Sequence, residues 1–170
     1  PQLRWVQSTW AGIDAIAHFA SETLQITPLK GVFGPAMTEY VMGWLLAIER
    51  DVISRASHTQ WTPSLEPRII GKRLGIMGAG GIGAAIALAA RPFGLEVIGL
   101  NSDGRAVEGF AACYPSADRL VFAEGIDYLV SVLPQTAQTE NLIDHEVLTR
   151  LNPRAIVINA GRGNAVVEAD

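Results

Sequence analysis

The chain has 170 residues, of which 49% are hydrophobic and 18% are charged, and that balance predicts a folded, well-buried α/β protein rather than a disordered one. A formal net charge of −4 and a pI near 5.4 indicate no basic surface for nucleic acid, and no apolar run is long enough to predict a membrane span. The single cysteine, Cys113, excludes an intrachain disulfide and favours a reducing cytoplasm.

The first part of the chain predicts two short strands, Arg4–Gln7 and Ile26–Leu29, with a loop and a helical segment between them. Ile13 and Ile16 have the spacing of a helix in that segment. The chain opens at Pro1 without a methionine and stops where a further helix begins. We therefore interpret the sequence as the middle part of a longer protein.

A long apolar helix is predicted next, from Pro35, which suits the first turn of a helix, to about Ala56. Large apolar residues lie on both of its faces, including Trp44 and Leu46. A domain or subunit interface would cover such a helix on two sides, and so would a central core position, and the pattern favours neither. A loop-like connector then leads to the next strand.

A glycine-rich turn between a strand and a helix is the most informative stretch of the sequence. The apolar run Arg73–Met77 predicts a buried strand, Ala84–Arg91 an alanine-rich helix, and Leu95–Leu100 a second strand. This order of elements places a pyrophosphate at the N-terminus of a helix. The residues of the turn that we predict to bind a dinucleotide are Gly78, Gly80, Gly81, Ile82 and Gly83.

Three of these positions have separate reasons to be glycine. Gly78 permits the tight turn, Gly80 lets the backbone approach the phosphates because it has no Cβ, and Gly83 lets the helix pack close to the strand. A purely structural glycine turn is the alternative. The strand before the motif and the helix after it favour the dinucleotide interpretation.

Three further strands are predicted after the glycine motif, at Arg119–Phe122, Tyr128–Leu133 and Ala155–Asn159. With the first two they predict a Rossmann-type, doubly wound parallel sheet. Asp144 is placed to cap a helix before the last strand. Only Ala123–Asp127 links the first two of these three strands, which is short for a parallel crossover. Either the crossover is abbreviated or residues are missing there.

The loop after the second strand bears on the choice of cofactor. A carboxylate that binds the ribose 2′-hydroxyl is expected at the end of this strand, and the residue there is Asn101. The uncharged amide removes repulsion against a 2′-phosphate, Ser102 can donate a hydrogen bond to it, and Arg105 can supply positive charge. This pattern favours NADP over NAD, although Asp103 can bind the ribose from a shifted position. An ordinary turn is compatible with both cofactors.

Arg162 follows the last predicted strand and is flanked by two glycines. A guanidinium there can pair with a carboxylate and polarise a ketone oxygen, and the alternative is that it satisfies carbonyls at the strand end. His18, His58 and His145 lie outside the candidate ligand loops, so we predict surface or helix-capping positions for them. The sequence contains no metal-ligand spacing and no nucleophile with a paired base.

Four stretches of the chain together resemble the D-isomer-specific 2-hydroxyacid dehydrogenase family. They are LRWVQSTWAGID (3–14), GKRLGIMGAGGIG (71–83), DYLVSVLPQTAQTENLID (127–144) and LNPRAIVINAGRGNAVVE (151–168). The form of Leu133–Thr136, with no histidine before it, resembles the glyoxylate/hydroxypyruvate reductase branch. The resemblance implies a dinucleotide-binding domain at 35–170, incomplete at its C-terminus and including an interdomain helix at 35–56. It also implies that 1–34 is a fragment of a flavodoxin-like substrate domain.

The resemblance implies a role for each matching residue. Arg162 would be the catalytic arginine that holds the 2-oxo acid beside the nicotinamide. The backbone amides of Ala11 and Gly12, with Trp10 beside them, would bind the substrate carboxylate. The helix 35–56 would help to form a homodimer. Besides the glycine turn and the 101–105 loop, the implied cofactor residues are Pro134 and Thr136, which border the adenosine half, and Ala160 and Gly161.

The implied function is hydride transfer between a nicotinamide cofactor, NADP with NAD not excluded, and a small 2-oxo or 2-hydroxy acid of the glyoxylate or hydroxypyruvate type. The family's general-acid histidine and its glutamate partner lie downstream of the arginine, beyond Asp170. Residues 1–170 alone are therefore expected to bind a dinucleotide without turnover. A non-catalytic dinucleotide-sensing module is the alternative, because the family's fold also serves corepressor proteins.

Overall fold

The computed structural model describes residues 2–63, 65 and 67–170. Its centre is a five-stranded sheet in which all neighbouring strands are parallel and the strand order is β5-β4-β3-β6-β7. The strands are β3 (Arg73–Met77), β4 (Glu96–Asn101), β5 (Ala112–Pro115), β6 (Tyr128–Ser131) and β7 (Ile156–Asn159). The chain thus builds outward from β3 on both sides, which is the predicted Rossmann-type, doubly wound arrangement.

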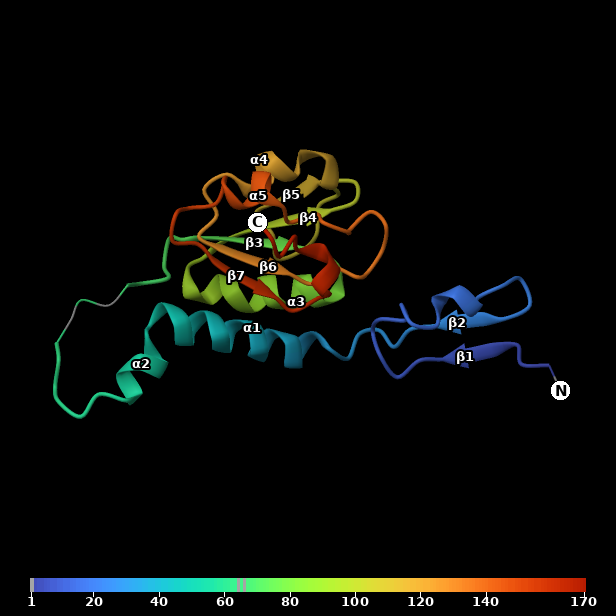
Figure 1. The fold of residues 1–170 in the computed structure, drawn as a ribbon, viewed down its shortest axis with the longest axis horizontal. Helices are drawn as coiled ribbons and strands as arrows, with labels where there is room; N and C mark the ends of the chain where they lie inside the picture. The colour runs from blue at the N-terminus through green and yellow to red at the C-terminus, as the bar shows by residue number, and fades with distance from the viewer. Residues whose placement is uncertain (1, 64, 66) are drawn as a thin grey trace.

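Helices cover both faces of the sheet, so the molecule has three layers here (Figure 1). One face carries α1 (Gly34–Glu49) and α3 (Gly81–Ala90), and the other carries α4 (Arg119–Ala123) and α5 (His145–Leu148). Successive strand residues serve the two cores in turn: in β6, Val130 packs with α1 and α3, and Leu129 packs with α4 and α5. Apolar runs such as these are typical of parallel strands buried on both faces.

The prediction for the third strand was wrong. Residues 119–122 belong to helix α4, and the third strand is β5, in a stretch where no strand was predicted. A short apolar run suits either structure, and the helix buries Phe122 and Ala123 fully against the sheet. The crossover from β5 to β6 therefore spans residues 116–127 and contains η3 (Ser116–Asp118) and α4. Its length is ordinary, so neither an abbreviated crossover nor missing residues are needed.

The predicted helices around the site are confirmed with small shifts at their ends. The helix predicted to begin at Ala84 begins at Gly81, with Gly80 as its N-cap, and it continues into η2 (Arg91–Phe93). Asp144 caps α5, because its Oδ1 accepts a hydrogen bond from the N–H of Val147 at 3.1 Å. That helix is a single short turn that ends at Leu148.

The helix predicted over 35–56 is two helices, α1 and α2 (Val52–Ala56). The break lies at Asp51, whose φ of 49° is in the left-handed region and interrupts the helix. Leu45 of α1 is fully buried against α3 and the sheet, whereas Tyr40 and Trp44 are exposed. In this chain α1 is therefore a core helix on one side and uncovered on the other.

Residues 2–33 form an arm that precedes α1 and extends beyond the edge of the sheet domain (Figure 1). Its two strands, β1 (Trp5–Gln7) and β2 (Gln25–Thr27), pair in parallel and confirm the two predicted strands. The predicted helical segment between them is only the 3₁₀ turn η1 (Ala17–Phe19). No helix among the described residues is long and apolar enough to cross a membrane.

Candidate active site

Four loops meet at the carboxyl ends of the parallel strands, where ligands of such sheets bind. They are 78–83 after β3, 101–105 after β4, 132–139 after β6 and 160–164 after β7. Because β3 is central, its glycine turn lies between the β4 loop on one side and the β6 and β7 loops on the other. A ligand lying across the turn would contact different loops at its two ends.

The glycine turn is fastened to the end of the neighbouring strand. The N–H of Gly78 donates a hydrogen bond to the carbonyl of Leu100 at 2.9 Å, and its φ of 105° favours glycine. A Cβ on Gly83 would strike the carbonyl oxygen of Gly78. Both positions therefore require glycine for the turn to form and for α3 to pack against it.

The N-terminus of α3 carries no cap from a side chain. Gly80 is its N-cap residue, and a Cβ on either Gly80 or Gly81 would meet nothing within 4 Å. A cavity of about 500 Å³ lies over this end of the helix, and Ile82 and Gly83 also border it. Uncapped backbone N–H groups at a helix N-terminus attract anions. These residues therefore fit the pyrophosphate of a dinucleotide.

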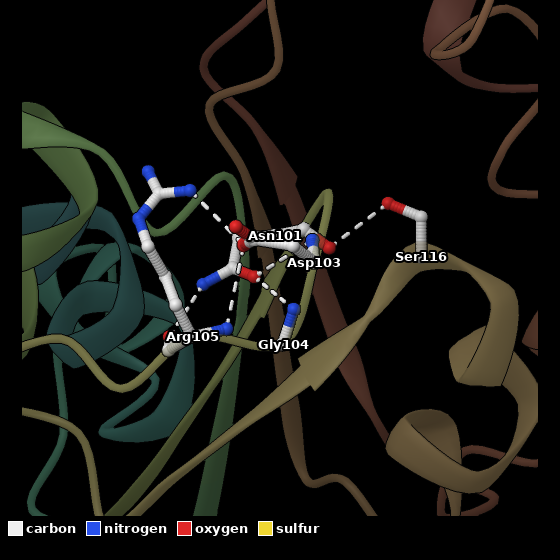
Figure 2. Close-up of polar contacts among 5 residues, drawn as sticks. All are labelled: Asn101, Asp103, Gly104, Arg105 and Ser116. Atoms are coloured by element: carbon white, nitrogen blue, oxygen red, sulfur yellow. Dashed lines mark hydrogen bonds and ion pairs between the residues drawn. The ribbon is translucent and has the colours of Figure 1, made fainter.

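The side chain of Asn101 closes the loop after β4 (Figure 2). Its Oδ1 accepts hydrogen bonds from the N–H groups of Asp103 at 3.3 Å and Gly104 at 2.6 Å. Its Nδ2 donates to the carbonyl of Arg105 at 2.8 Å, and the hydroxyl of Ser116 donates to the Asn101 carbonyl at 3.1 Å. Both polar atoms of the Asn101 side chain therefore form hydrogen bonds within the loop and stabilise its conformation.

Arg105 and Asp103 form an ion pair at the surface of the same loop, with Nη1 and Oδ1 3.0 Å apart. Their side chains are 61% and 57% exposed, and ion pairs this exposed contribute little to stability. Ser102 beside them is also exposed. Breaking this ion pair therefore costs little free energy, so Arg105 can pair with a phosphate instead. Asp103 is exposed, so it is also accessible to a ribose.

Two hydrogen bonds hold the guanidinium of Arg162 in place. Its Nε donates to Oδ2 of Asp14 at 2.8 Å, and its Nη1 donates to the carbonyl of Gly161 at 3.2 Å. A Cβ on Gly12 would strike Nη2, so this nitrogen lies directly against the Gly12 backbone. The side chain of Arg162 is still 40% exposed, so part of the guanidinium remains open to a ligand.

Arg162 borders a cavity of about 600 Å³, a volume typical of small-molecule sites. The residues predicted to bind substrate, Trp10, Ala11 and Gly12, line it, and so does Ile82 of the glycine turn. Ile82 and Ala11 also border the cavity over the N-terminus of α3. The predicted substrate residues and the glycine turn therefore share one region of the molecule.

The loops after β6 and β7 complete this region. A Cβ on Gly161 would lie 2.6 Å from the carbonyl oxygen of Leu133, so the two loops touch only because residue 161 is glycine. Pro134, Ala160 and Gly161 line the Arg162 cavity. Thr136 lies in an adjoining hollow and pairs with the hydroxyl of Thr139 at 3.1 Å. The Asn101–Arg105 loop lies across the glycine turn from them.

Two residues of the site were not predicted from the sequence. Asp14 pairs with Arg162, and Asn159 shapes the Arg162 loop by accepting from the N–H of Gly161 at 3.1 Å and donating to the Arg162 carbonyl at 2.9 Å. The acidic end of the stretch 3–14 was the available signal for Asp14, but its partner is 148 positions away.

The histidines are exposed and border neither cavity. Among the described residues, no group of His, Cys, Asp or Glu is arranged to hold a metal ion.

The sequence profile described as "D-isomer specific 2-hydroxyacid dehydrogenase, NAD binding domain" matches residues 43–170. Among curated proteins, the glyoxylate/hydroxypyruvate reductase B of Salmonella typhi is 33% identical over 182 residues, which cover 99% of this chain and 55% of that protein. The chain thus spans about half the length of the curated relatives it matches.

Solved structures agree with this match. A D-isomer specific 2-hydroxyacid dehydrogenase family protein from Aeromonas salmonicida has a TM-score of 0.85 and 35% identity, covering 98% of this chain and 55% of that one. An NADPH-dependent glyoxylate/hydroxypyruvate reductase from Sinorhizobium meliloti, in complex with NADP and sulfate, has a TM-score of 0.86 and 28% identity, covering 99% and 56%. The likeness therefore extends over the arm as well as the sheet domain.

Proposed function

The chain belongs to the D-isomer specific 2-hydroxyacid dehydrogenase family, and from that premise we propose that its protein transfers a hydride between a nicotinamide cofactor and a small 2-oxo or 2-hydroxy acid. Glyoxylate and hydroxypyruvate are the proposed substrates, because relatives that match nearly the whole chain carry those names. The observation that carries the proposal is the cavity in which Arg162 faces both the predicted substrate loop and the glycine turn.

Arg162 has the chemistry that the reaction needs. The nicotinamide cofactor, when bound, supplies or accepts the hydride. The guanidinium of Arg162 would pair with the substrate carboxylate and stabilise negative charge that develops on the carbonyl oxygen. The backbone at Ala11 and Gly12 would orient the same carboxylate, and Nη2 of Arg162 lies against Gly12. No described histidine borders the cavity, so we assign proton donation to none of the three.

NADP is the proposed cofactor, and NAD is the alternative that the kinetic comparison below tests. The proposal is supported by the neutral amide of Asn101, which is committed to its own loop, and by the exposed Ser102 and Arg105 beside it. The Sinorhizobium meliloti relative was solved with NADP. The backbone at the N-terminus of α3 would hold the pyrophosphate, as the open space over Gly80 allows.

The proposal extends to domains, assembly and location. Residues 35–170 are the dinucleotide-binding domain with its interdomain helix, and 1–34 belong to the substrate domain. The exposed aromatic stripe of α1, with Tyr40 and Trp44, is the proposed surface of a homodimer. A cytoplasmic location is consistent with the single free thiol of Cys113.

The test of the function is the substitution Arg162→Ala in the full-length gene product. We expect kcat/KM for glyoxylate and hydroxypyruvate, followed by NADPH oxidation, to fall at least about a hundredfold, because charge stabilisation at the carbonyl oxygen is lost. The Kd for NADPH should stay within about twofold, because the residues proposed to hold the pyrophosphate and the ribose lie in the loops after β3 and β4. Arg150→Ala, which breaks a surface ion pair with Glu124, is the matched control.

An unchanged kcat/KM in the Arg162→Ala variant would overturn the assignment. A wild-type protein that binds NADPH, turns over neither acid and changes its assembly on binding would instead support the dinucleotide-sensing alternative. NADH measured beside NADPH on the wild type decides between the two cofactors.

A further inference from the structure

The ion pair between Asp14 and Arg162 joins the arm to the loop after β7. The two residues are 148 positions apart in sequence, and Nε of Arg162 lies 2.8 Å from Oδ2 of Asp14. Both line the Arg162 cavity, and the side chain of Asp14 is only 24% exposed. A carboxylate placed in the wall of a cavity that is proposed to receive another carboxylate requires an explanation, because like charges repel.

We propose that Asp14 is a positioning residue that fixes the Nε edge of Arg162, so that the Nη groups face the 2-oxo acid. This inference rests on the proposed function of Arg162. The guanidinium is planar and its donors form a rigid fork. One contact at Nε and a second from Nη1 to the Gly161 carbonyl fix that plane. Nη2 is then directed to the Gly12 backbone, on the predicted substrate loop.

The geometry of the Asp14–Arg162 ion pair distinguishes two roles for Asp14, orienting Arg162 and competing with the substrate for it. Asp14 contacts Arg162 through the single nitrogen Nε, whereas a substrate carboxylate pairs best with two N–H groups of a guanidinium at once. Asp14 therefore contacts neither Nη nitrogen, and Nη1, which carries two N–H groups, gives only one of them to the Gly161 carbonyl. If it instead competed with the substrate for Arg162, its removal would strengthen substrate binding. Positioning predicts the opposite sign.

The pair also makes the site depend on how the arm lies. Asp14 follows the substrate loop in the arm, and Arg162 follows β7 in the sheet domain, so the contact forms only when the arm lies over the carboxyl ends of the strands. An Arg162 side chain without this contact would lose the fixed plane and with it part of the advantage of orientation.

The experiment compares Asp14→Ala and Asp14→Asn with wild type in the full-length gene product. We expect Asp14→Ala to raise KM for glyoxylate and the Kd for oxalate, used as a non-reacting probe on the NADPH complex, by at least about tenfold. The Kd for NADPH should stay within about twofold. Asp14→Asn keeps an acceptor oxygen in place and should recover part of the loss. Glu124→Gln weakens a surface pair of the same 2.8 Å length and is the control.

The double variant Asp14→Ala with Arg162→Ala tests whether Asp14 acts through Arg162. We expect oxalate binding by the double variant to equal that of Arg162→Ala alone, because a residue that only positions Arg162 has nothing left to position. Tighter oxalate binding in Asp14→Ala, additive losses in the double variant, or equal losses of oxalate and NADPH binding would overturn the proposal. If Arg162→Ala itself were without effect, the proposed function would fail instead.

Discussion

Asn101 shapes the loop after β4 and also leaves the end of that strand uncharged, so one substitution can change both properties. Its amide oxygen binds two loop N–H groups and its amide nitrogen binds the Arg105 carbonyl (Figure 2). An aspartate there would keep both acceptor contacts, lose the donor and add a negative charge beside the proposed 2′-phosphate site. We expect Asn101→Asp to raise the Kd for NADPH at least about tenfold and to leave the Kd for NADH nearly unchanged. Titration of both cofactors measures this.

Asp103→Asn is the matched variant, because it removes a negative charge from the same loop and frees Arg105. The NADPH complex should then become tighter. If Asn101→Asp weakens NADPH and NADH equally, the amide acts through the shape of the loop, and its neutrality does not select the cofactor.

At the scale of residues, local constraints were predictable and distant partners were not. Gly78 and Gly83 were predicted from the strand and helix on either side of them, and their φ angle and close approach require glycine. Asp14 was missed because its partner belongs to a loop at the other end of the chain. The sequence pattern identified the missing carboxylate at position 101. It did not predict that the Asn101 amide would form hydrogen bonds within its own loop.

At the scale of elements, the error at 119–122 has a physical cause. Four apolar or amphipathic residues in a row fit a buried strand or one helical turn equally well, and only the position of Phe122 against β4 and β6 distinguishes them. Longer elements such as α3 and β3 were predicted because caps, glycines and apolar runs agree. The break between α1 and α2 was missed because a left-handed Asp51 carries no glycine signal.

Asp144 contributes to stability at the end of α5 in a way that depends on pH. Burial alone would raise its pKa, but the N–H of Val147 and the guanidinium of Arg119, with Nη1 at 2.8 Å, hold the pKa below its ordinary value. A carboxyl with a lowered folded-state pKa stabilises the fold above its unfolded pKa, and this stabilisation is lost as the pH falls through the folded value. Asp144→Asn should therefore cost about 1 kcal/mol near neutral pH.

The measurement is urea unfolding of wild type and Asp144→Asn from about pH 7 to about pH 3, where the difference between them should shrink as the wild-type carboxyl is protonated. Glu146→Gln is the control, because that carboxylate also contacts Arg119 but is 66% exposed and should change little. A difference that stays constant with pH would show that Asp144 acts only as a neutral cap.

At the scale of the whole molecule, α1 runs along one side of the sheet domain and leads back to the arm, which lies beyond the edge of that domain (Figure 1). The arm reaches the carboxyl ends of the strands through Asp14 and the substrate loop. Helix α1 packs on α3 with one face and leaves the other uncovered. The parallel sheet and the glycine turn were predictable because they repeat a local pattern. The meeting of residues 10–12 with Arg162 was expected from the family resemblance alone, and the contact between Asp14 and Arg162 was not predicted, because it depends on how the arm lies over the strand ends.

The uncovered face of α1 leads to the last prediction. Tyr40, Trp44 and Ile48 recur every four residues, so they form one stripe, and they are 50%, 44% and 47% exposed. Aromatic residues at the centre of an interface dominate its binding energy. If this stripe is the proposed homodimer surface, Trp44→Glu should raise the dimer Kd at least about a hundredfold, measured by sedimentation velocity over a range of concentrations.

The control is Trp61→Glu, at a side chain 92% exposed in the connector before β3, which should leave the dimer intact. A wild-type protein that is monomeric at all concentrations, or a Trp44→Glu variant with unchanged mass, would place the dimer surface elsewhere or remove it.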